Sequence, residues 1–319
     1  MVINFDICTG TYGATFTFVN KCDYTVWPGI LAGSGTPPLE TTGFELPQQT
    51  SRSFQAPNGW SGRFWGRTGC KFNGTGPGSC STADCGSGQV ECNGAGASPP
   101  ATLAEFTLGS GSEGSQDFYD VSLVDGYNVA MIIEASGGSG MCAATGCVTD
   151  LNRYCPAELK VSNGDACKSA CEAFGKPEYC CSGPNNTPAT CKPSAYAALF
   201  KMACPRAYSY AYDDLTSTFT CTGADYTMTF CPSIPTSPTA LVDATLTTTK
   251  DDGSSVTGDQ QPSTMSGAPS PGTSGSESGS GSGPEPKVMT SGSSDSSSRN
   301  HSHSTLRVFF IALAFIVFL

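Results

Sequence analysis

The sequence predicts a mainly β domain, a β-sandwich stapled by disulfide bonds. Three observations carry this prediction. Short segments such as Thr15–Phe18 and Tyr226–Phe230 alternate polar and apolar residues, as strands with one buried face do. The 38 glycines and 22 prolines interrupt the chain every few residues, which favours many short strands over long helices. Sixteen of the seventeen cysteines lie between Cys22 and Cys231, an even number within one block.

Further strands are expected where β-branched and aromatic residues gather. The segments in question are Tyr24–Trp27, Arg63–Trp65, Val129–Ile133 and Thr218–Cys221. Because the first and last predicted strands are both rich in β-forming residues, we expect the two ends of the domain to meet in one sheet. Trp60 and Trp65 are interpreted as core residues, with sugar stacking as the alternative.

Helical signals are confined to the middle of the chain. Cys167 and Cys171 are four residues apart and precede Gly175, and Ser194 is placed to cap a helix over Ala195–Ala203. Cysteines are densest here, whereas large apolar residues are few. We therefore predict a loop-rich lobe over residues 155–204 that disulfide bonds hold together. Adjacent Cys180 and Cys181 should pair with different partners.

The distribution of histidine excludes several chemistries. Both histidines, His301 and His303, lie outside the cysteine block, so the predicted domain has no histidine for a zinc site or for a base beside a nucleophile. No metal and no cofactor are expected, and any catalysis must use carboxylates. The cysteines are interpreted as up to eight disulfides of a secreted protein, with Cys8 left over.

The ends of the chain predict export and a lipid anchor. Residues 1–13 are interpreted as a truncated signal peptide or a misassigned start, with a short N-terminal extension as the alternative. The domain should span 14–232, followed by a Ser/Gly/Pro-rich disordered stalk over 233–296. Residues 297–319 end in twelve apolar residues, too few for a membrane-spanning helix of about twenty.

That C-terminal pattern is typical of a glycolipid (GPI) anchor signal, with Ser296 as the attachment residue. The protein would then lie on the outer face of the plasma membrane, in the apoplast or cell wall. The alternative is an uncleaved tail that inserts shallowly. Asn73 and Asn185 are N-glycosylation acceptors, although Pro188 weakens the second.

The net charge of the predicted domain limits the classes of partner that it can bind. Residues 14–232 hold twelve Lys and Arg against nineteen Asp and Glu, a net charge of −7, and no basic run follows a phosphate backbone. Nucleic acid is therefore excluded as a partner. A neutral or cationic ligand fits better, and we expect a monomer.

One segment carries a specific family resemblance. The run from Gly76 to Cys92, with Cys80, Cys85 and Gly88 at fixed spacing, matches the thaumatin signature at every position. The chain is also similar to plant thaumatin-like proteins of pathogenesis-related class 5 at 14–22, 24–27, 103–106, 155–159, 179–181 and 207–210. The resemblance covers residues 14–232. It implies the pairs Cys22–Cys231, Cys70–Cys80, Cys85–Cys92, Cys142–Cys221, Cys147–Cys204, Cys155–Cys167, Cys171–Cys180 and Cys181–Cys191.

The resemblance also implies a thaumatin-like β-sandwich, a disulfide-rich lobe over 151–204, a small hairpin lobe over 68–104, and a cleft between sandwich and lobe. The family's cleft residues correspond to Arg63, Glu105, Asp120, Asp125 and Asp214. Glycoside hydrolysis needs one protonated and one ionised carboxyl group. Glu105 is the candidate acid, with Asp120 or Asp125 as its catalytic partner.

Three functions remain open at this point. The leading one is a defence or wall protein that binds β-1,3-glucan through the acidic cleft. The second is a weak endo-β-1,3-glucanase, and the third a non-catalytic scaffold or receptor-like partner. Tyr208, Tyr210 and Tyr212 would share one face if their segment is a strand, where they would either stack on sugar rings or pack in the sandwich.

Overall fold

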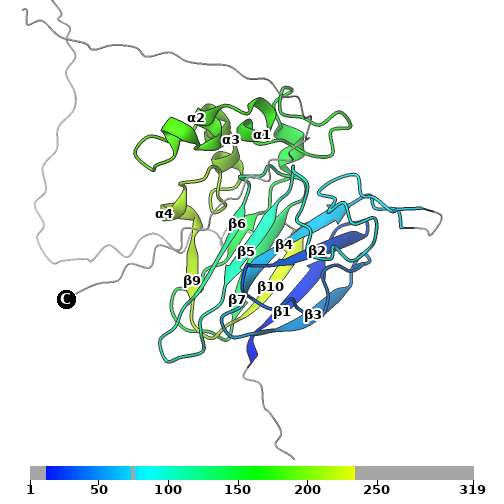
Figure 1. Ribbon diagram of the computed structural model, residues 1–319, viewed down its shortest axis with the longest axis vertical. Coiled ribbons are helices and arrows are strands. Elements are labelled where there is room, and N and C mark those ends of the chain that lie inside the picture. Colours follow the sequence, from blue (N-terminus) through cyan, green and yellow to red (C-terminus); the bar gives the residue numbers. More distant parts are fainter. Residues whose placement is uncertain (1–11, 73–75, 234–319) are drawn as a thin grey trace, which may run out of the picture. The chain divides into compact units, whose positions relative to one another are not determined.

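The computed structural model describes residues 12–72 and 76–233, and strands dominate them (Figure 1). The strands are Tyr12–Asn20 (β1), Val26–Ala32 (β2), Ser51–Pro57 (β3), Ser61–Thr68 (β4), Leu103–Thr107 (β5), Asp117–Ser122 (β6), Met131–Ser136 (β7), Thr145–Cys147 (β8), Phe219–Cys221 (β9) and Asp225–Phe230 (β10). They form two five-stranded sheets, in the orders β3-β1-β10-β7-β8 and β2-β4-β5-β6-β9. The predicted β-sandwich class is confirmed.

The two ends of the domain lie side by side in the first sheet, as expected. Strand β1 pairs in parallel with β10, with Phe16 opposite Tyr226 and Phe18 opposite Met228. Cys22 and Cys231 follow these strands and form a disulfide with a Cα–Cα distance of 5.0 Å. Strand β1 begins two residues before the predicted domain start at Ala14.

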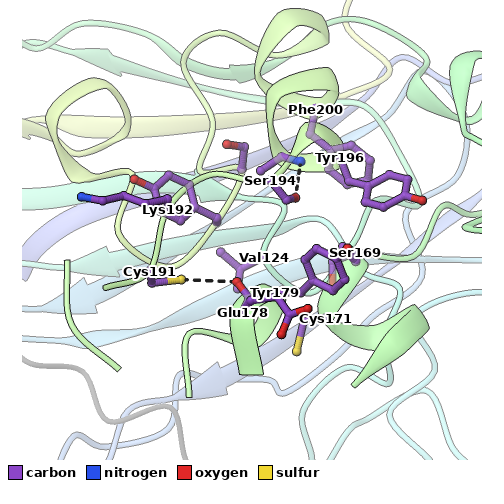
Figure 2. A pocket seen from close by; sticks show the side chains of 14 residues that line it. Val124, Ser169, Cys171, Glu178, Tyr179, Cys191, Lys192, Ser194, Tyr196 and Phe200 are labelled. Atoms are coloured by element: carbon purple, nitrogen blue, oxygen red, sulfur yellow. Dashed lines mark hydrogen bonds between the residues drawn. The ribbon is translucent and has the colours of Figure 1, made fainter. Parts of the chain in front are cut away.

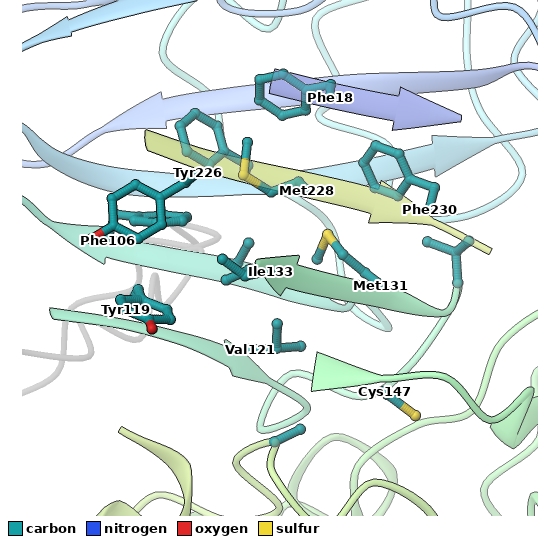
Figure 3. Close-up of a cluster of buried hydrophobic side chains, with 14 of the residues drawn as sticks. Phe18, Phe106, Tyr119, Val121, Met131, Ile133, Cys147, Tyr226, Met228 and Phe230 are labelled. Carbon is teal, nitrogen blue, oxygen red and sulfur yellow. The ribbon is translucent and has the colours of Figure 1, made fainter. Parts of the chain in front are cut away.

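The core lies between the two sheets and is rich in aromatic side chains (Figure 3). Phe16 packs edge-on against Phe106, with ring centroids 4.8 Å apart, and Phe106 packs edge-on against Tyr226 at 5.1 Å. Trp60 is also fully buried in this cluster, so its interpretation as a core residue is correct. Alternating strand residues point into this core, which sends their neighbours to the outer faces of the sheets.

The lobe holds most of the helical structure, as predicted, and lies beyond one end of the strands (Figure 1). Its elements are Leu151–Tyr154 (η1), Ala170–Phe174 (α1), Pro177–Cys180 (α2), Gly183–Asn185 (η2) and Ala195–Ala203 (α3). Ser194 caps α3 by accepting a hydrogen bond from the Ala197 amide at 3.1 Å. A further short helix, Asp214–Ser217 (α4), precedes β9.

Disulfides hold the lobe and its surroundings in place. All eight cysteine pairs implied by the family resemblance are present, and Cys180 and Cys181 bond to different partners. Three of the bonds lie entirely within the lobe: Cys155–Cys167, Cys171–Cys180 and Cys181–Cys191. Cys8 lies outside the described residues.

The segment between β4 and β5 covers part of the second sheet's outer face. Outside residues 73–75, it has isolated bridges such as Lys71 with Ser79 but no regular strand. Trp65 on the sheet packs with Cys85, Cys92 and Leu103 in a second, smaller core. Arg67 is fully buried beneath the segment. It donates hydrogen bonds to the Trp27 carbonyl on β2 and to the Val90 carbonyl of the segment. The thaumatin signature thus forms a lid over Trp65 and Arg67 on this sheet.

The tyrosine segment is not a strand, so the hypothesis of a shared tyrosine face is wrong. Residues 207–213 form turns, with one isolated bridge between Tyr208 and Ser122. Hydrogen bonds of their own fix two of the rings, because Tyr208 donates to Asp214 and Tyr212 donates to the Asn186 carbonyl. These side-chain bonds compete with the regular ladder that a period-two pattern suggests.

Candidate functional site

Three of the five predicted site residues form a row across the second sheet. Arg63 on β4 lies opposite Glu105 on β5, and Glu105 lies opposite Asp120 on β6. Their chain neighbours Phe64, Phe106 and Tyr119 are buried in the core. Because successive strand residues point to opposite faces, the three charged side chains point to the outer face. All three are half-buried.

The other two residues reach this row from loops. Asp125 follows β6 in a turn whose backbone is fixed by a 2.9 Å hydrogen bond from the Ala101 amide to the Asp125 carbonyl. Asp214 begins α4 and accepts a hydrogen bond from the Tyr208 hydroxyl at 2.9 Å. Asp125 interacts electrostatically with Glu105, and Asp214 with Asp120. We call these five residues, Arg63, Glu105, Asp120, Asp125 and Asp214, the acidic cluster.

Burial and neighbouring charges together raise the pKa values of three carboxyl groups in the cluster. Burial raises the pKa of Glu105 to about 7, with Arg63 opposing and Asp125 reinforcing the shift. Burial, Glu105 and Asp214 raise the pKa of Asp120 well above its usual range. Burial also raises the pKa of Asp125, against the influence of Arg63. The raised pKa values of Glu105 and Asp120 favour their protonated forms, so a protonated carboxyl group of this row can donate a hydrogen bond where an ionised one can only accept.

An ion pair next to the cluster supports Asp214. Lys201 on α3 and Asp213 form an ion pair at 2.9 Å. Asp213 also accepts hydrogen bonds from the Ser209 amide and hydroxyl and from Thr216. This network fixes the turn that carries Tyr208 and Asp214. Asp213 and Asp214 are adjacent in the sequence, and nothing in the sequence indicated that Asp213 would pair with Lys201 while Asp214 joined the acidic cluster.

Glu172 is an acidic residue near the cluster that the sequence analysis missed. It lies on α1 of the lobe, and its pKa is raised by burial and by Asp125, with Lys168 opposing. Its Oε1 atom lies 3.8 Å from Lys168 Nζ. Only the i, i+4 spacing of this pair was visible in the sequence, and that pattern usually marks a solvated helix face.

Two pockets of the described residues lie outside the five residues of the acidic cluster. Figure 2 shows a pocket between α1, α2 and α3, where Val124 and Ser169 lie near Tyr179 and Tyr196. Its volume of about 30 Å³ holds roughly one water molecule, too little for a sugar ring. A larger cavity of about 340 Å³ lies between residues 80–84 and 98–100 and lobe residues 161–166.

Of the predicted glycosylation and anchor residues, only Asn185 lies among the residues that the structure describes. Asn185 is half-buried, and its side-chain nitrogen donates to the Thr190 carbonyl at 3.1 Å. Asn73, Ser296, the stalk and the anchor segment lie outside the described residues. Within residues 12–72 and 76–233, no group of three or more His, Cys, Asp or Glu side chains is arranged to hold a metal. The same residues include no helix long and apolar enough to cross a membrane.

Comparison with known proteins agrees with this architecture. A model described as the thaumatin family matches residues 20–232. Thaumatin-like protein 1 of Arabidopsis thaliana is 69% identical over 231 residues, which cover 71% of this chain and 89% of that protein. Pathogenesis-related thaumatin-like protein 3.5 of Cryptomeria japonica is 59% identical over 237 residues, 73% and 95% of the two chains. A Prunus avium protein named glucan endo-1,3-beta-glucosidase is 54% identical over 228 residues, 70% and 92%. The chain belongs to the thaumatin family.

Proposed function

We propose that this protein binds β-1,3-glucan through its acidic cluster and acts in defence at the plant cell wall. The observation that carries the proposal is the row of Arg63, Glu105 and Asp120 on the outer face of the second sheet. The names of its relatives, a pathogenesis-related protein and a glucan endo-1,3-beta-glucosidase among them, favour the same ligand and role.

The chemistry of the cluster suits a neutral, hydroxyl-rich chain. An ionised carboxylate accepts hydrogen bonds from sugar hydroxyls, whereas a protonated Glu105 and the Arg63 guanidinium donate them. Such bonds gain strength where the partners are partly shielded from water, as these half-buried residues are. An anionic polysaccharide would instead meet repulsion from four neighbouring carboxyl groups.

The proposed location combines the disulfides with the sequence of the chain's end. Eight disulfides require an oxidising compartment, which supports secretion. The GPI anchor near Ser296 and the outer face of the plasma membrane rest on the composition of residues 297–319 alone. A tethered domain of this kind would hold the acidic cluster against the cell wall.

The second candidate function is a weak endo-β-1,3-glucanase, and the raised pKa of Glu105 favours it. A carboxyl group with a pKa of about 7 is protonated at the mildly acidic pH of a cell wall. Glu105 would give its proton to the glycosidic oxygen while the bond from that oxygen to the anomeric carbon breaks. The electron pair of the bond leaves with the oxygen, and Arg63 stabilises the carboxylate that remains on Glu105.

Asp125 is the better ionised partner in this mechanism. Asp120 lies directly opposite Glu105, and burial, Glu105 and Asp214 all raise its pKa, whereas at Asp125 the charge of Arg63 opposes the rise in pKa that burial causes. Asp125 would either attack the anomeric carbon or take a proton from an attacking water. The first route requires carboxyl groups about 5–5.5 Å apart and the second about 6.5–9.5 Å, so the stereochemistry of the product identifies the route.

One pair of assays separates these functions. The purified protein is tested for binding on a glycan array and for release of reducing ends from laminarin, beside Glu105→Gln and the control Glu134→Gln. Glu134 is exposed on β7 in the other sheet. A binder binds laminarin without releasing ends, and an enzyme loses hydrolysis but keeps binding in Glu105→Gln. Absence of any glucan binding would overturn the proposal and leave the scaffold function.

A further inference from the structure

The larger cavity lies between two walls that disulfides fix. Its volume of about 340 Å³ falls within the range of small-molecule sites, about 300–1,000 Å³. Wall residues 80–84 of the lid lie between the disulfides Cys70–Cys80 and Cys85–Cys92. Wall residues 161–166 of the lobe lie inside the loop that Cys155–Cys167 closes. Because both walls are cross-linked, a ligand does not have to order them when it binds.

The turn at Gly126 packs between the two walls. Gly126 has a φ of +88°, and a Cβ atom at this position would lie 2.7 Å from the Cys167 carbonyl oxygen and 2.8 Å from Pro100 Cβ. Pro100 lines the cavity, and Cys167 follows the lobe wall directly. Tyr127 and Cys167 also exchange two backbone hydrogen bonds of 2.8 Å. These contacts hold the walls in a fixed relation to each other.

Asp84 provides a carboxylate that no other described residue uses. It belongs to the thaumatin signature, is half-buried and lines the cavity. Its backbone carbonyl accepts a 2.7 Å hydrogen bond from the Ser98 amide, but its side chain has no hydrogen bond or ion pair within the described part of the chain. Its charge acts on Arg67 without an ion pair. The buried oxygens that lack partners belong to other side chains, so both Asp84 oxygens remain accessible to a ligand.

The other lining residues indicate the class of ligand. Ser98 and Ser162 are exposed on opposite walls, and their hydroxyl groups make no hydrogen bond to another described residue. Pro99 and Pro100 add apolar ring surface. Lys, Arg, His and aromatic residues are absent from the lining, so an anion finds no opposite charge and a flat aromatic ligand finds no ring to stack on. A neutral ring with hydroxyl groups at its edge and C–H groups on its faces matches these walls.

We propose that this cavity is a second carbohydrate site of the domain and binds one neutral sugar ring. The Asp84 carboxylate accepts hydrogen bonds from ring hydroxyl groups, and these bonds are charge-assisted. Ser98 and Ser162 bond to the ring from opposite walls, and the proline rings contact its C–H groups. The site shares no residue with the acidic cluster, so it does not rest on the proposed function of that cluster.

The test is a nuclear magnetic resonance titration of the isotope-labelled full chain with methyl β-D-glucopyranoside. Binding should shift the amide signals of residues 81–84 and 161–163, with a dissociation constant on the order of 1 mM for a ligand of this size. Asp84→Asn keeps the shape of the side chain but loses its charge, so the dissociation constant should rise about tenfold. The matched control Asp150→Asn changes an exposed aspartate outside the cavity and should titrate like the wild type.

A second variant blocks the cavity instead of removing the acceptor. Ser162→Trp places a large side chain at an exposed wall position, so it should abolish the shifts even if Asp84→Asn fails to fold. No shift of the wall amides at about 100 mM glucoside would overturn the site, because a ligand with a dissociation constant near 1 mM saturates it there. An unchanged dissociation constant in both variants would do the same. Shifts confined to the strands of the acidic cluster would overturn this site and leave the proposed function intact.

Discussion

The acidic cluster should cost the protein stability at neutral pH, and Glu105→Gln measures that cost. The pKa of Glu105 rises from an ordinary 4.5 to about 7 on folding, chiefly because of burial. Between these values the folded protein binds more protons than the unfolded chain, so the free energy of unfolding falls as pH rises through this window. Below it both states are protonated, and the cost disappears.

The magnitude follows from the size of the shift. A pKa difference of about 2.5, from 4.5 to about 7, corresponds to about 3 kcal/mol once the pH is above both values. Glutamine keeps the size of the side chain but cannot ionise. Its introduction also removes the charge that raises the pKa of Asp120, which acts in the same direction. Glu105→Gln should therefore be about 3 kcal/mol more stable than the wild type near pH 8, and about equal to it near pH 4.

The assay is unfolding in guanidinium chloride without reductant, followed by circular dichroism at both pH values. The control is Glu134→Gln, which changes the same side chain at an exposed position and should follow the wild type at both pH values. A difference between Glu105→Gln and the wild type that is the same at pH 4 and pH 8 would refute the reasoning, because it would show that the carboxyl group does not titrate in that window.

Three further predictions concern the lid, acid stability and the anchor. Arg67→Met should lower the free energy of unfolding by about 3 kcal/mol, since the partly buried carbonyls of Trp27 and Val90 lose donors at 3.0 and 2.5 Å; an unchanged guanidinium midpoint would contradict this. Burial raises the pKa of Glu91, but hydrogen bonds from Thr41, Thr42 and Gly43 outweigh it and lower that pKa. Its stabilisation is present above about pH 4.3 and lost as pH falls through the folded-state pKa, so Glu91→Gln should be destabilised at pH 7 and match the wild type near pH 2 in the same unfolding assay. A phospholipase specific for glycolipid anchors should release the protein from membranes without detergent, and retention in the pellet, or an intact C-terminus at residue 319 by mass spectrometry, would remove the anchor hypothesis.

Local patterns in the sequence predicted much of the fold because their physical causes are local. Alternation at Thr15–Phe18 and Tyr226–Phe230 marked β1 and β10, and Ser194 marked the start of α3. The cysteine block predicted a disulfide-bonded domain. The individual pairs came from the resemblance to the thaumatin family, since spacing alone permits many pairings. Tyr208–Tyr212 showed the limit of such patterns, because side-chain hydrogen bonds hold that segment in turns.

The acidic cluster depends on contacts that no local pattern encodes. The sequence alone predicted that any catalysis would use carboxylates, because the predicted domain has no histidine, and the family resemblance named five residues. Only the tertiary structure set Glu105 opposite Asp120, and brought Glu172 from the lobe to Asp125. Strand register and lobe packing join residues far apart in the chain, and the pKa of a carboxyl group depends on the burial and charges that those contacts create.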